Sequence, residues 1–352
     1  MKLKLLCATL SIALALSLTA CNTPQSQPAP SPTPPAEQTP EVSQTEDPEA
    51  NVESHYPIEI VTYNYEGEEV ITVYEKAPER VLAVYQGSIE TMIALGLEER
   101  VIASYGLDNE VKEEWKDGLS KMNYSETSFA PDLETVVTMQ PDLILSWGSL
   151  FGERTLGDVP YWHERGTNTY INTNTRRGGA RLLEHEYTDI LNIGKIFDVE
   201  DRAEAIVNTM KADVELARAA VANESEVPTV AVIRISESSI RNYGMELGGD
   251  IVKSLGLNVM TSVENTLGKE DLILADPDII FIEYMPRPDR GGDELRVAAL
   301  ALVLDDPSLA SLSAVNNNRV YAIMLGDIYA PAVRTGDGIR TIAEGVFPSI
   351  FD

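Results

Sequence analysis

Apolar and polar positions alternate in blocks that predict strands and helices in turn along most of the chain. Two β-rich runs on either side of residues 65–68 predict a hairpin over residues 58–74. Residues 80–84 then form a short apolar run typical of a buried strand. Residues 87–96 carry apolar side chains at helical spacing until a glycine ends the pattern. Because strands and helices continue to alternate, we expect an α/β fold with mainly parallel sheets covered by helices.

The second half of the chain repeats the order of elements found in the first half. Residues 229–233 predict a buried strand, and residues 249–257 predict a helix that glycine ends. A Pro-Asp pair precedes the strand run 279–282, just as one precedes the strand run 143–146. This weak internal duplication predicts two similar Rossmann-like lobes.

A long stretch of helix-forming residues separates the two halves. Residues 181–197 carry an apolar stripe, and residues 199–221 are rich in Ala, Glu, Lys and Met with few helix breakers. A helix of about 22 residues would be about 33 Å long, and Asp201 would cap its start. We therefore expect a rigid helical connector that restricts the motion of the lobes. The predicted boundaries are 56–178 for the N-terminal lobe, 179–222 for the connector and 223–352 for the C-terminal lobe.

The first twenty residues predict an export signal. A basic start precedes an apolar stretch that is too short to cross a membrane as a mature helix. It ends in a Leu-Thr-Ala-Cys sequence that resembles the lipobox of bacterial lipoproteins, so we expect Cys21 to carry a lipid anchor. Residues 1–20 are then the signal peptide, and residues 21–55, rich in Pro, Gln, Ser and Thr, form a disordered tether. These features predict an extracytoplasmic protein anchored to the cell membrane; the alternative is an ordinary signal peptide that ends in a cysteine by chance.

Composition narrows the chemistry of the mature chain. The only other cysteine, Cys7, lies within the signal, so the mature fold has neither a disulfide nor a thiolate metal site. The net charge is −29, and it becomes −31 when the two lysines of the signal leave. Such a charge argues against nucleic acid and anionic lipid surfaces as partners. An acidic protein can still contain a cationic pocket, so the net charge leaves the ligand open.

The sequence contains no motif of a known catalytic site. It has no Gly-x-Ser-x-Gly elbow, no P-loop and no Gly-x-Gly-x-x-Gly after a strand. His55 falls at the end of the tether, which leaves His163 and His185 in the fold, too few for a protein-ligated transition-metal site. We therefore expect no catalytic residue, no cofactor and no metal held by the protein itself. An alternative from another class is an envelope-anchored hydrolase that uses paired carboxylates, such as Asp250 with Glu283.

Aromatic and cationic residues follow the predicted strands, where α/β folds place their ligands. Arginines bind carboxylate and catecholate oxygens through charge-assisted, often bidentate hydrogen bonds, while flat rings cover the apolar faces of a chelate. Any one of these residues could be an ordinary solvated loop residue, but their repetition at several strand ends favours a ligand site. The candidate ligand-binding residues are Tyr85, Gln86, Tyr105, Trp147, Arg176, Arg177, Arg234, Tyr243, Tyr284, Arg287 and Arg334, with Arg241 and Arg290 in the same loops.

The order and spacing of these segments resemble those of the ABC-importer binding proteins for siderophores, haem and cobalamin. In this class (class III) a helical backbone joins the two lobes. The resemblance covers about residues 77–351, nearly the whole mature fold. The segments that carry it are 77–84, 87–90, 94–97, 132–134, 141–145, 248–250, 276–280, 306–309 and 318–321.

The resemblance implies a ligand cleft between the lobes, modest closure, and delivery of the ligand to an ABC permease dimer. It also implies one docking glutamate on each lobe, and by position these match Glu90 and Glu270. Exposed carboxylates there would orient the complex with permease arginines and speed the encounter. The alternative for each is a glutamate favoured by the dipole of a helix N-terminus. We expect the protein itself to be a monomer.

The richness in arginine favours an anionic ferric chelate of the siderophore type as the ligand, with iron present only as part of the bound chelate. Haem is an alternative, because tyrosines are available as axial ligands. Cobalamin is a second alternative, although it would favour an aromatic cleft with few charges. The sequence leaves open whether the chelate is a catecholate, a hydroxamate or a citrate complex, and which permease receives it.

Overall fold

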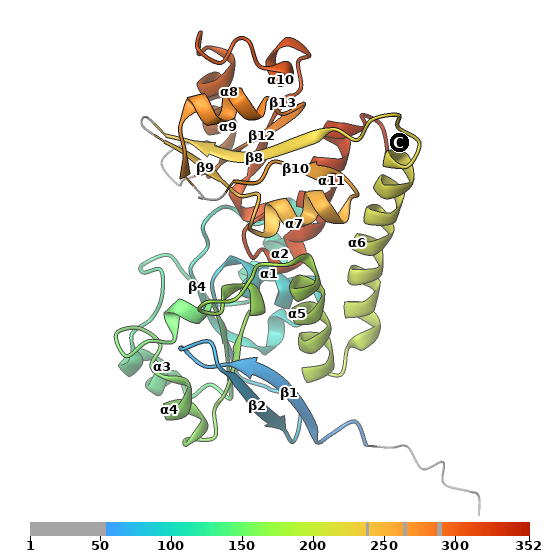
Figure 1. The fold of residues 1–352 in the computed structure, drawn as a ribbon. Helices are drawn as coiled ribbons and strands as arrows, with labels where there is room; N and C mark the ends of the chain where they lie inside the picture. The colour runs from blue at the N-terminus through green and yellow to red at the C-terminus, as the bar shows by residue number, and fades with distance from the viewer. Residues whose placement is uncertain (1–53, 237–238, 263–265, 287–290) are drawn as a thin grey trace, which may run out of the picture. The chain divides into compact units, whose positions relative to one another are not determined.

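Two sheets, one from each half of the chain, organise the fold in the computed structural model (Figure 1). The structure describes residues 54–236, 239–262, 266–286 and 291–352. The predicted signal, the lipidation site Cys21 and most of the predicted tether lie outside the described residues. Residues 53–352 form one compact unit.

The N-terminal sheet is parallel throughout, as the alternation of strands and helices predicts. Its strands run in the order β5-β4-β3-β6-β7. Val81 and Ala83 of β3 point into one apolar cluster, and Leu82 and Val84 point into another. Both faces are therefore buried, which explains the continuous apolar run in the sequence. The strands are β3 (Val81–Val84), β4 (Val101–Tyr105), β5 (Tyr124–Ser125), β6 (Leu143–Ser146) and β7 (Asn168–Ile171), and the helices are α1 (Gln86–Ala94), α2 (Lys116–Ser120), α3 (Leu133–Met139) and α4 (Val159–His163).

The predicted hairpin is confirmed and packs against this sheet. Strands β1 (Ile58–Tyr63) and β2 (Glu69–Tyr74) pair antiparallel. The side chain of Asn64 closes the turn by accepting the backbone N–H of Glu68 at 2.9 Å and donating to its carboxylate at 3.0 Å. Gly67 has a φ of 87°, which explains the glycine in this turn.

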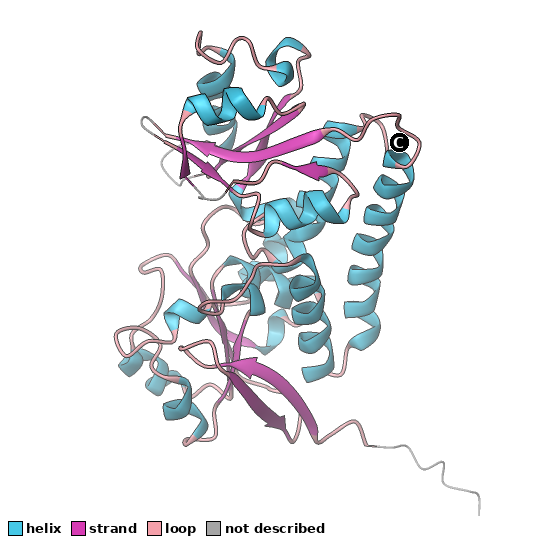
Figure 2. Cartoon of the chain, viewed as in Figure 1, coloured by secondary structure: helices cyan, strands magenta, loops and turns pink. Residues whose placement is uncertain are grey.

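The C-terminal sheet is mixed. Strands β10, β8, β12 and β13 are parallel, whereas β9 and β11 add an antiparallel edge (Figure 2). The strands are β8 (Thr229–Ile235), β9 (Ile240–Asn242), β10 (Asn258–Val259), β11 (Thr266–Leu267), β12 (Ile279–Tyr284) and β13 (Val320–Met324). The helices are α7 (Leu247–Ser254), α8 (Lys269–Ala275), α9 (Gly292–Leu304), α10 (Ser313–Asn316) and α11 (Thr335–Val346).

The connector consists of two packed helices, α5 (Leu183–Ile196) and α6 (Glu200–Val221), the second of which has the 22 residues expected. A sharp turn at Asp198, with a φ of 55°, joins them. The N-cap residue of α6 is Val199, so the prediction that Asp201 caps this helix is wrong. Asp201 lies within the first turn of the helix. Gly194 lets the helices approach closely, because a Cβ there would lie too near that of Ala203.

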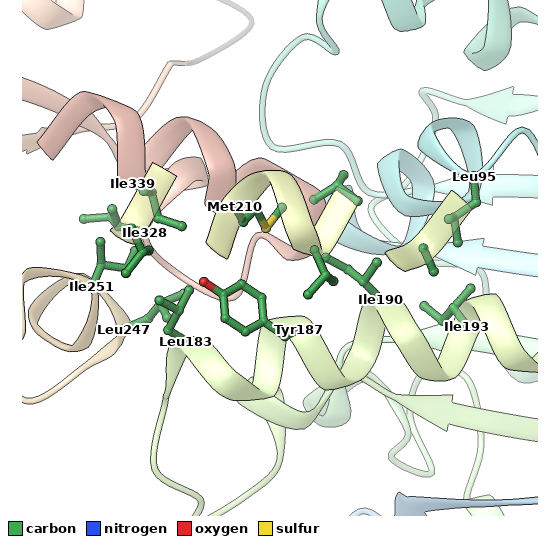
Figure 3. Close-up of a cluster of buried hydrophobic side chains, with 14 of the residues drawn as sticks. Leu95, Leu183, Tyr187, Ile190, Ile193, Met210, Leu247, Ile251, Ile328 and Ile339 are labelled. Atoms are coloured by element: carbon green, nitrogen blue, oxygen red, sulfur yellow. The ribbon is translucent and has the colours of Figure 1, made fainter. Parts of the chain in front are cut away.

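One apolar cluster runs from the N-terminal sheet along α5 and α6 to the helices of the C-terminal sheet. Figure 3 shows Leu95 of the N-terminal half, Ile190 of α5, and Ile251 and Ile339 of the C-terminal half in this cluster. The prediction of a rigid helical connector between the lobes is therefore incomplete, because the two halves also share an apolar core. None of the helices in the described residues is both long enough and apolar enough to span a membrane.

Candidate functional site

Five aromatic rings from both halves form a row, which we call the aromatic row. Tyr85 lies edge-on to Phe129 and Trp147, with centroids 6.4 Å and 4.4 Å away. Trp147 stacks on Tyr329 at 5.8 Å, and Tyr329 meets Tyr243 edge-on at 6.3 Å. The first three rings belong to the N-terminal half and the last two to the C-terminal half. The row therefore marks the line along which the two halves meet.

The backbone of Tyr85 is strained at its place in the aromatic row. Tyr85 follows β3 directly and has a φ of 87° and a ψ of 151°, a backbone conformation that residues other than glycine rarely adopt. Its N–H donates to the carbonyl of Tyr105 at 2.8 Å, and its carbonyl accepts the N–H of Ile89 at 3.1 Å. Such strain costs about 1–3 kcal/mol and concentrates at ligand sites. The geometry therefore marks Tyr85 as a candidate contact residue.

Two arginines lie against the aromatic row and share one carboxylate. The guanidinium of Arg181 lies 3.6 Å from the ring centroid of Tyr329, and that of Arg241 lies 5.0 Å from the centroid of Tyr243. Glu246 binds both, with Arg181 Nη1 at 2.9 Å and Arg241 Nη2 at 2.6 Å. These contacts hold the guanidinium planes against the rings, where they can meet an anionic group that competes with Glu246.

A second pair of arginines faces one hollow of the C-terminal sheet. Arg234 of β8 and Arg241 of β9 are direct partners in an antiparallel pair, so their side chains project from the same face. Like charges directly opposite each other are destabilising unless an anion lies near them. Each arginine is about half exposed, and the two line a hollow of about 510 Å³ together with Ser236, Ser239 and Thr266. Two arginines and three residues with side-chain hydroxyl groups therefore line this hollow.

Buried Glu283 partly offsets this positive charge. Its carboxylate lies 3.4 Å from Arg234 Nε, and its side chain is only 2% exposed. Burial raises the pKa of Glu283, while Arg234, Arg241 and the hydroxyl of Tyr243 oppose the rise. Two carboxyl groups therefore lie beside the two arginines: Glu246, which binds Arg241, and Glu283, which burial makes costly to ionise.

The structure brings four of the predicted ligand residues into this region. Tyr85, Trp147 and Tyr243 belong to the aromatic row, and Arg234 lines the hollow. Tyr243 is only 1% exposed, so in this conformation its ring packs against Tyr329 and is not accessible to a ligand.

Three residues predicted to contact the ligand or the permease are instead buried together in one polar cluster. Arg334 was expected to contact the ligand and Glu90 to dock the permease, but they form an ion pair whose Nε–Oε2 and Nη2–Oε1 distances are 2.6 Å and 2.7 Å. Gln86 was also expected at the ligand, but it donates to Glu90 at 2.6 Å and accepts the backbone N–H of Asp108 and Asn109. The side chain of Glu90 is fully buried, so in this conformation it cannot reach a partner protein.

The remaining predicted residues lie elsewhere. The half-buried side chain of Arg176 lies over the ring of Tyr63 at 4.7 Å, next to the hairpin, and Arg177 is exposed. Tyr105 packs against the second apolar cluster of its sheet, and Tyr284 packs against the core of the C-terminal sheet. Arg287 and Arg290 lie outside the described residues, and Glu270 is exposed in the first turn of α8.

Sequence reasoning missed Arg181, Glu246, Phe129 and Tyr329. Tyr329 follows β13 by five residues, so the strand-end criterion that identified Trp147 would also have found it. Arg181 was assigned to the helical connector, although it precedes α5. Phe129 and Glu246 lie in loops with no signal that distinguishes them from ordinary loop residues.

The carboxylates considered for hydrolysis have separate structural partners. Asp250 accepts the backbone N–H of Leu183 at 2.8 Å, at the start of the connector. Glu283 lies beside Arg234 and Tyr243. Nothing in the described residues supports the hydrolase alternative.

Comparisons with known proteins give matches that extend over both halves of the chain. The family model described as "Periplasmic binding protein" matches residues 81–324. A solved periplasmic binding protein from Veillonella parvula DSM 2008 is 30% identical, has a TM-score of 0.77, and the match covers 84% of this chain and 93% of that chain. The ABC transporter substrate-binding lipoprotein YvrC of Bacillus subtilis (strain 168) is 22% identical over 79% of this chain and 82% of its own.

A further solved structure has the same fold at lower identity. The siderophore-binding protein BauB, bound to two molecules of acinetobactin and ferric iron, is 18% identical with a TM-score of 0.60, and the match covers 82% of this chain and 98% of that chain. The family model extends over both sheets and over the connector between them. Because this model matches well over half of the sequence, the chain belongs to the periplasmic binding protein family, a family of solute-binding proteins.

Proposed function

We propose that this protein captures an anionic ferric chelate of the siderophore type and delivers it to an ABC importer. The chelate would satisfy the iron by itself, and the protein would recognise the outer surface of the complex. The ligand would lie over the hollow lined by Arg234 and Arg241, with its apolar face against the aromatic row. No catalytic step is needed for this function.

The observation that carries the proposal is the cross-strand pair of Arg234 and Arg241. Glu246 and Glu283 offset part of the charge of these two guanidinium groups, and an anionic ligand would accept hydrogen bonds from the donors that remain on the same face. The half-exposed side chains leave donors free for such a ligand. The siderophore-binding relative supports the class of ligand, and the name of the Bacillus subtilis relative supports the transporter.

The test is a titration of the full-length protein with candidate ligands, in which binding is monitored by tryptophan fluorescence. The ligands are ferric citrate, ferric catecholate and ferric hydroxamate complexes, haem and cobalamin. We expect saturable quenching by an anionic ferric complex, because Trp147 lies in the aromatic row. Trp147→Phe should remove most of the signal, and Arg234→Gln or Arg241→Gln should weaken binding about 10-fold or more, the value of a charge-assisted hydrogen bond.

The matched control is Arg296→Gln, an exposed arginine of α9 paired only with its helix neighbour Asp293 in the described contacts. Its affinity should equal that of the wild type. Quenching by haem or cobalamin alone would replace the siderophore assignment with one of these two ligands. Turnover of a glycan or ester by the purified protein would instead favour an enzyme.

We further propose that Glu270 contacts the permease, a role that does not depend on the chemistry of the ligand. Glu270 is exposed in the first turn of α8, and Leu274, one turn further along, is 86% exposed. An exposed carboxylate can orient a protein partner and speed the encounter, and the exposed Ile273 and Leu274 lie on the same helix. The lipid anchor at Cys21 would keep this surface near the permease at the outer face of the membrane.

This role separates uptake from binding. In cells that take up the ligand through this protein, Glu270→Ala should lower the rate of uptake several-fold, while the dissociation constant for the ligand stays unchanged. Glu344→Ala, at an exposed glutamate of α11, is the control and should have no effect. Unchanged uptake by Glu270→Ala would exclude the docking role.

A further inference from the structure

Three potential metal ligands meet where the start of the fold contacts the turn of the connector. His55 precedes β1, Asp198 lies in the turn between α5 and α6, and Glu200 begins α6. The Nδ1 atom of His55 lies 3.4 Å from Oδ1 of Asp198 and 3.5 Å from Oε1 of Glu200. One ligand atom from each residue lies within 4.8 Å of the other two. The predicted tether ends at His55, but in the structure this residue is partly buried against the connector.

Backbone contacts orient His55 toward the two carboxylates. Its Nε2 atom lies 2.8 Å from the carbonyl oxygen of Lys195, and because a carbonyl only accepts, Nε2 carries the proton. The lone pair of Nδ1 in the neutral ring therefore faces Asp198 and Glu200. The neighbouring Tyr56 donates to the carbonyl of Ile196 at 2.7 Å, which holds the same segment on the last turn of α5. A carbonyl that fixes the second ring nitrogen is the usual support of a metal-binding histidine.

The distances fit a shared cation better than a direct ion pair. A charge-assisted hydrogen bond between an imidazolium and a carboxylate is about 2.7–2.9 Å long, and both distances here are longer. Ligand atoms about 2.0–2.2 Å from a tetrahedral metal lie about 3.3–3.6 Å apart, which matches the two separations from Nδ1 of His55; the ligand atoms of Asp198 and Glu200 lie within 4.8 Å of each other. Two carboxylate oxygens that face Nδ1 across such a gap require positive charge nearby, which a metal ion between them or a proton on Nδ1 would supply.

We propose that His55, Asp198 and Glu200 bind one divalent transition metal ion of the Zn²⁺ type, with water in the remaining position. One imidazole nitrogen and two carboxylate oxygens form a ligand set that such ions accept. The site would join the first residues of the fold to the turn of the connector, a contact across more than 140 residues of sequence. The metal would therefore fix the turn between α5 and α6. The site shares no residue with the aromatic row or the hollow, so this proposal can be tested independently of the proposed function.

The test uses the full-length protein, purified without a histidine tag and freed of metal with a chelator. Zn²⁺ affinity is measured by competition with a chromophoric chelator, and Co²⁺ binding is measured by its visible absorption. We expect one saturable site in the wild type and at least a tenfold loss of affinity in His55→Gln, Asp198→Asn and Glu200→Gln. Asparagine tolerates the φ of 55° at position 198, so this variant keeps the backbone of the turn.

The matched control is Glu204→Gln, an exposed glutamate one turn further along α6, which should bind like the wild type. Circular dichroism and urea unfolding of the metal-free variants confirm that each one folds. The proposal is overturned if the wild type shows no saturable site, or if the three ligand variants bind as tightly as Glu204→Gln. It is also overturned if His55→Gln leaves the Co²⁺ absorption unchanged, because the metal would then lack a nitrogen ligand.

Discussion

Glu90 and Arg334 are the most deeply buried ion pair among the described residues. Their side chains are 0% and 6% exposed, and two parallel hydrogen bonds join them. Gln86 adds a third hydrogen bond to the carboxylate, and the carbonyl of Glu110 accepts from Arg334 at 2.8 Å. The pair links α1 of the N-terminal half to the start of α11. Burial raises the pKa of Glu90, while Arg334 opposes the rise, so each charge depends on the other.

Removing one member of this pair should destabilise the protein strongly. Arg334→Met leaves the buried carboxylate without its counter-charge, a loss of about 3–5 kcal/mol in the free energy of unfolding. Urea unfolding without ligand measures this quantity. The double variant Glu90→Met with Arg334→Met should recover much of the loss, since it buries neither charge.

The control for this measurement is the ion pair of Arg218 with Glu215 on α6, in which both side chains are exposed. Arg218→Met should cost no more than about 1 kcal/mol, as is usual for an exposed pair. If Arg334→Met is equally mild and uptake falls instead, Glu90 acts at the surface in the working protein.

At the residue scale, the sequence predicts which side chains end the strands but not which of them are buried. Tyr85 and Trp147 directly follow their strands, Arg234 is the last residue but one of β8, and each lies in the candidate site. Glu90 has the same local signal as an exposed helix residue. Its partner Arg334 lies 244 residues away in sequence, so no local pattern reveals the ion pair.

Among the elements, the buried parallel strands β3, β6, β8 and β12 and the two connector helices follow from apolar periodicity alone. The antiparallel edge of the C-terminal sheet does not, because β9 has three residues and β11 has two. This edge nevertheless places Arg241 opposite Arg234, so the part of the fold with the weakest signal builds the hollow. The same limit applies to α5 and α6: the pattern predicts each helix, but their contact depends on Gly194 and Ala203, which carry no apolar signal.

At the scale of the whole molecule, buried carboxyl groups lie where the two halves meet the connector. Glu186 of α5 accepts the backbone N–H of Ala332 at 2.6 Å, and Asp327 lies 3.9 Å from Arg334. Burial raises the pKa of Glu186 to about 8 and that of Asp327 to about 7. The nearby carboxylates of Asp189 and Asp337 add to these two shifts respectively. Folding therefore keeps protons on groups that would ionise near pH 4 in the unfolded chain.

This arrangement predicts that the protein becomes less stable as the pH rises from about 4 to about 8. In that window these carboxyl groups bind more protons in the folded than in the unfolded state, so their contribution to the free energy of unfolding falls with increasing pH; the lowered pKa values of His163 and His185 offset part of the fall near pH 6. The contribution of each group is fully present below its unfolded pKa and is lost as the pH passes its folded pKa. Urea unfolding of the wild type at pH 5, 6, 7 and 8 should show a falling midpoint.

Asp327→Asn tests whether one buried carboxyl group causes part of this decrease in stability with increasing pH. Asparagine has the shape of the protonated acid and does not ionise, so the variant should gain stability relative to the wild type between pH 5 and pH 8. The gain should be on the order of 1 kcal/mol for each unit of pKa shift that the substitution removes. Asp293→Asn, at an exposed residue of α9, should leave the slope unchanged. A constant difference between Asp327→Asn and the wild type at every pH would mean that Asp327 is already ionised in the folded protein, with Arg334 and Lys112 supplying enough positive charge to hold it.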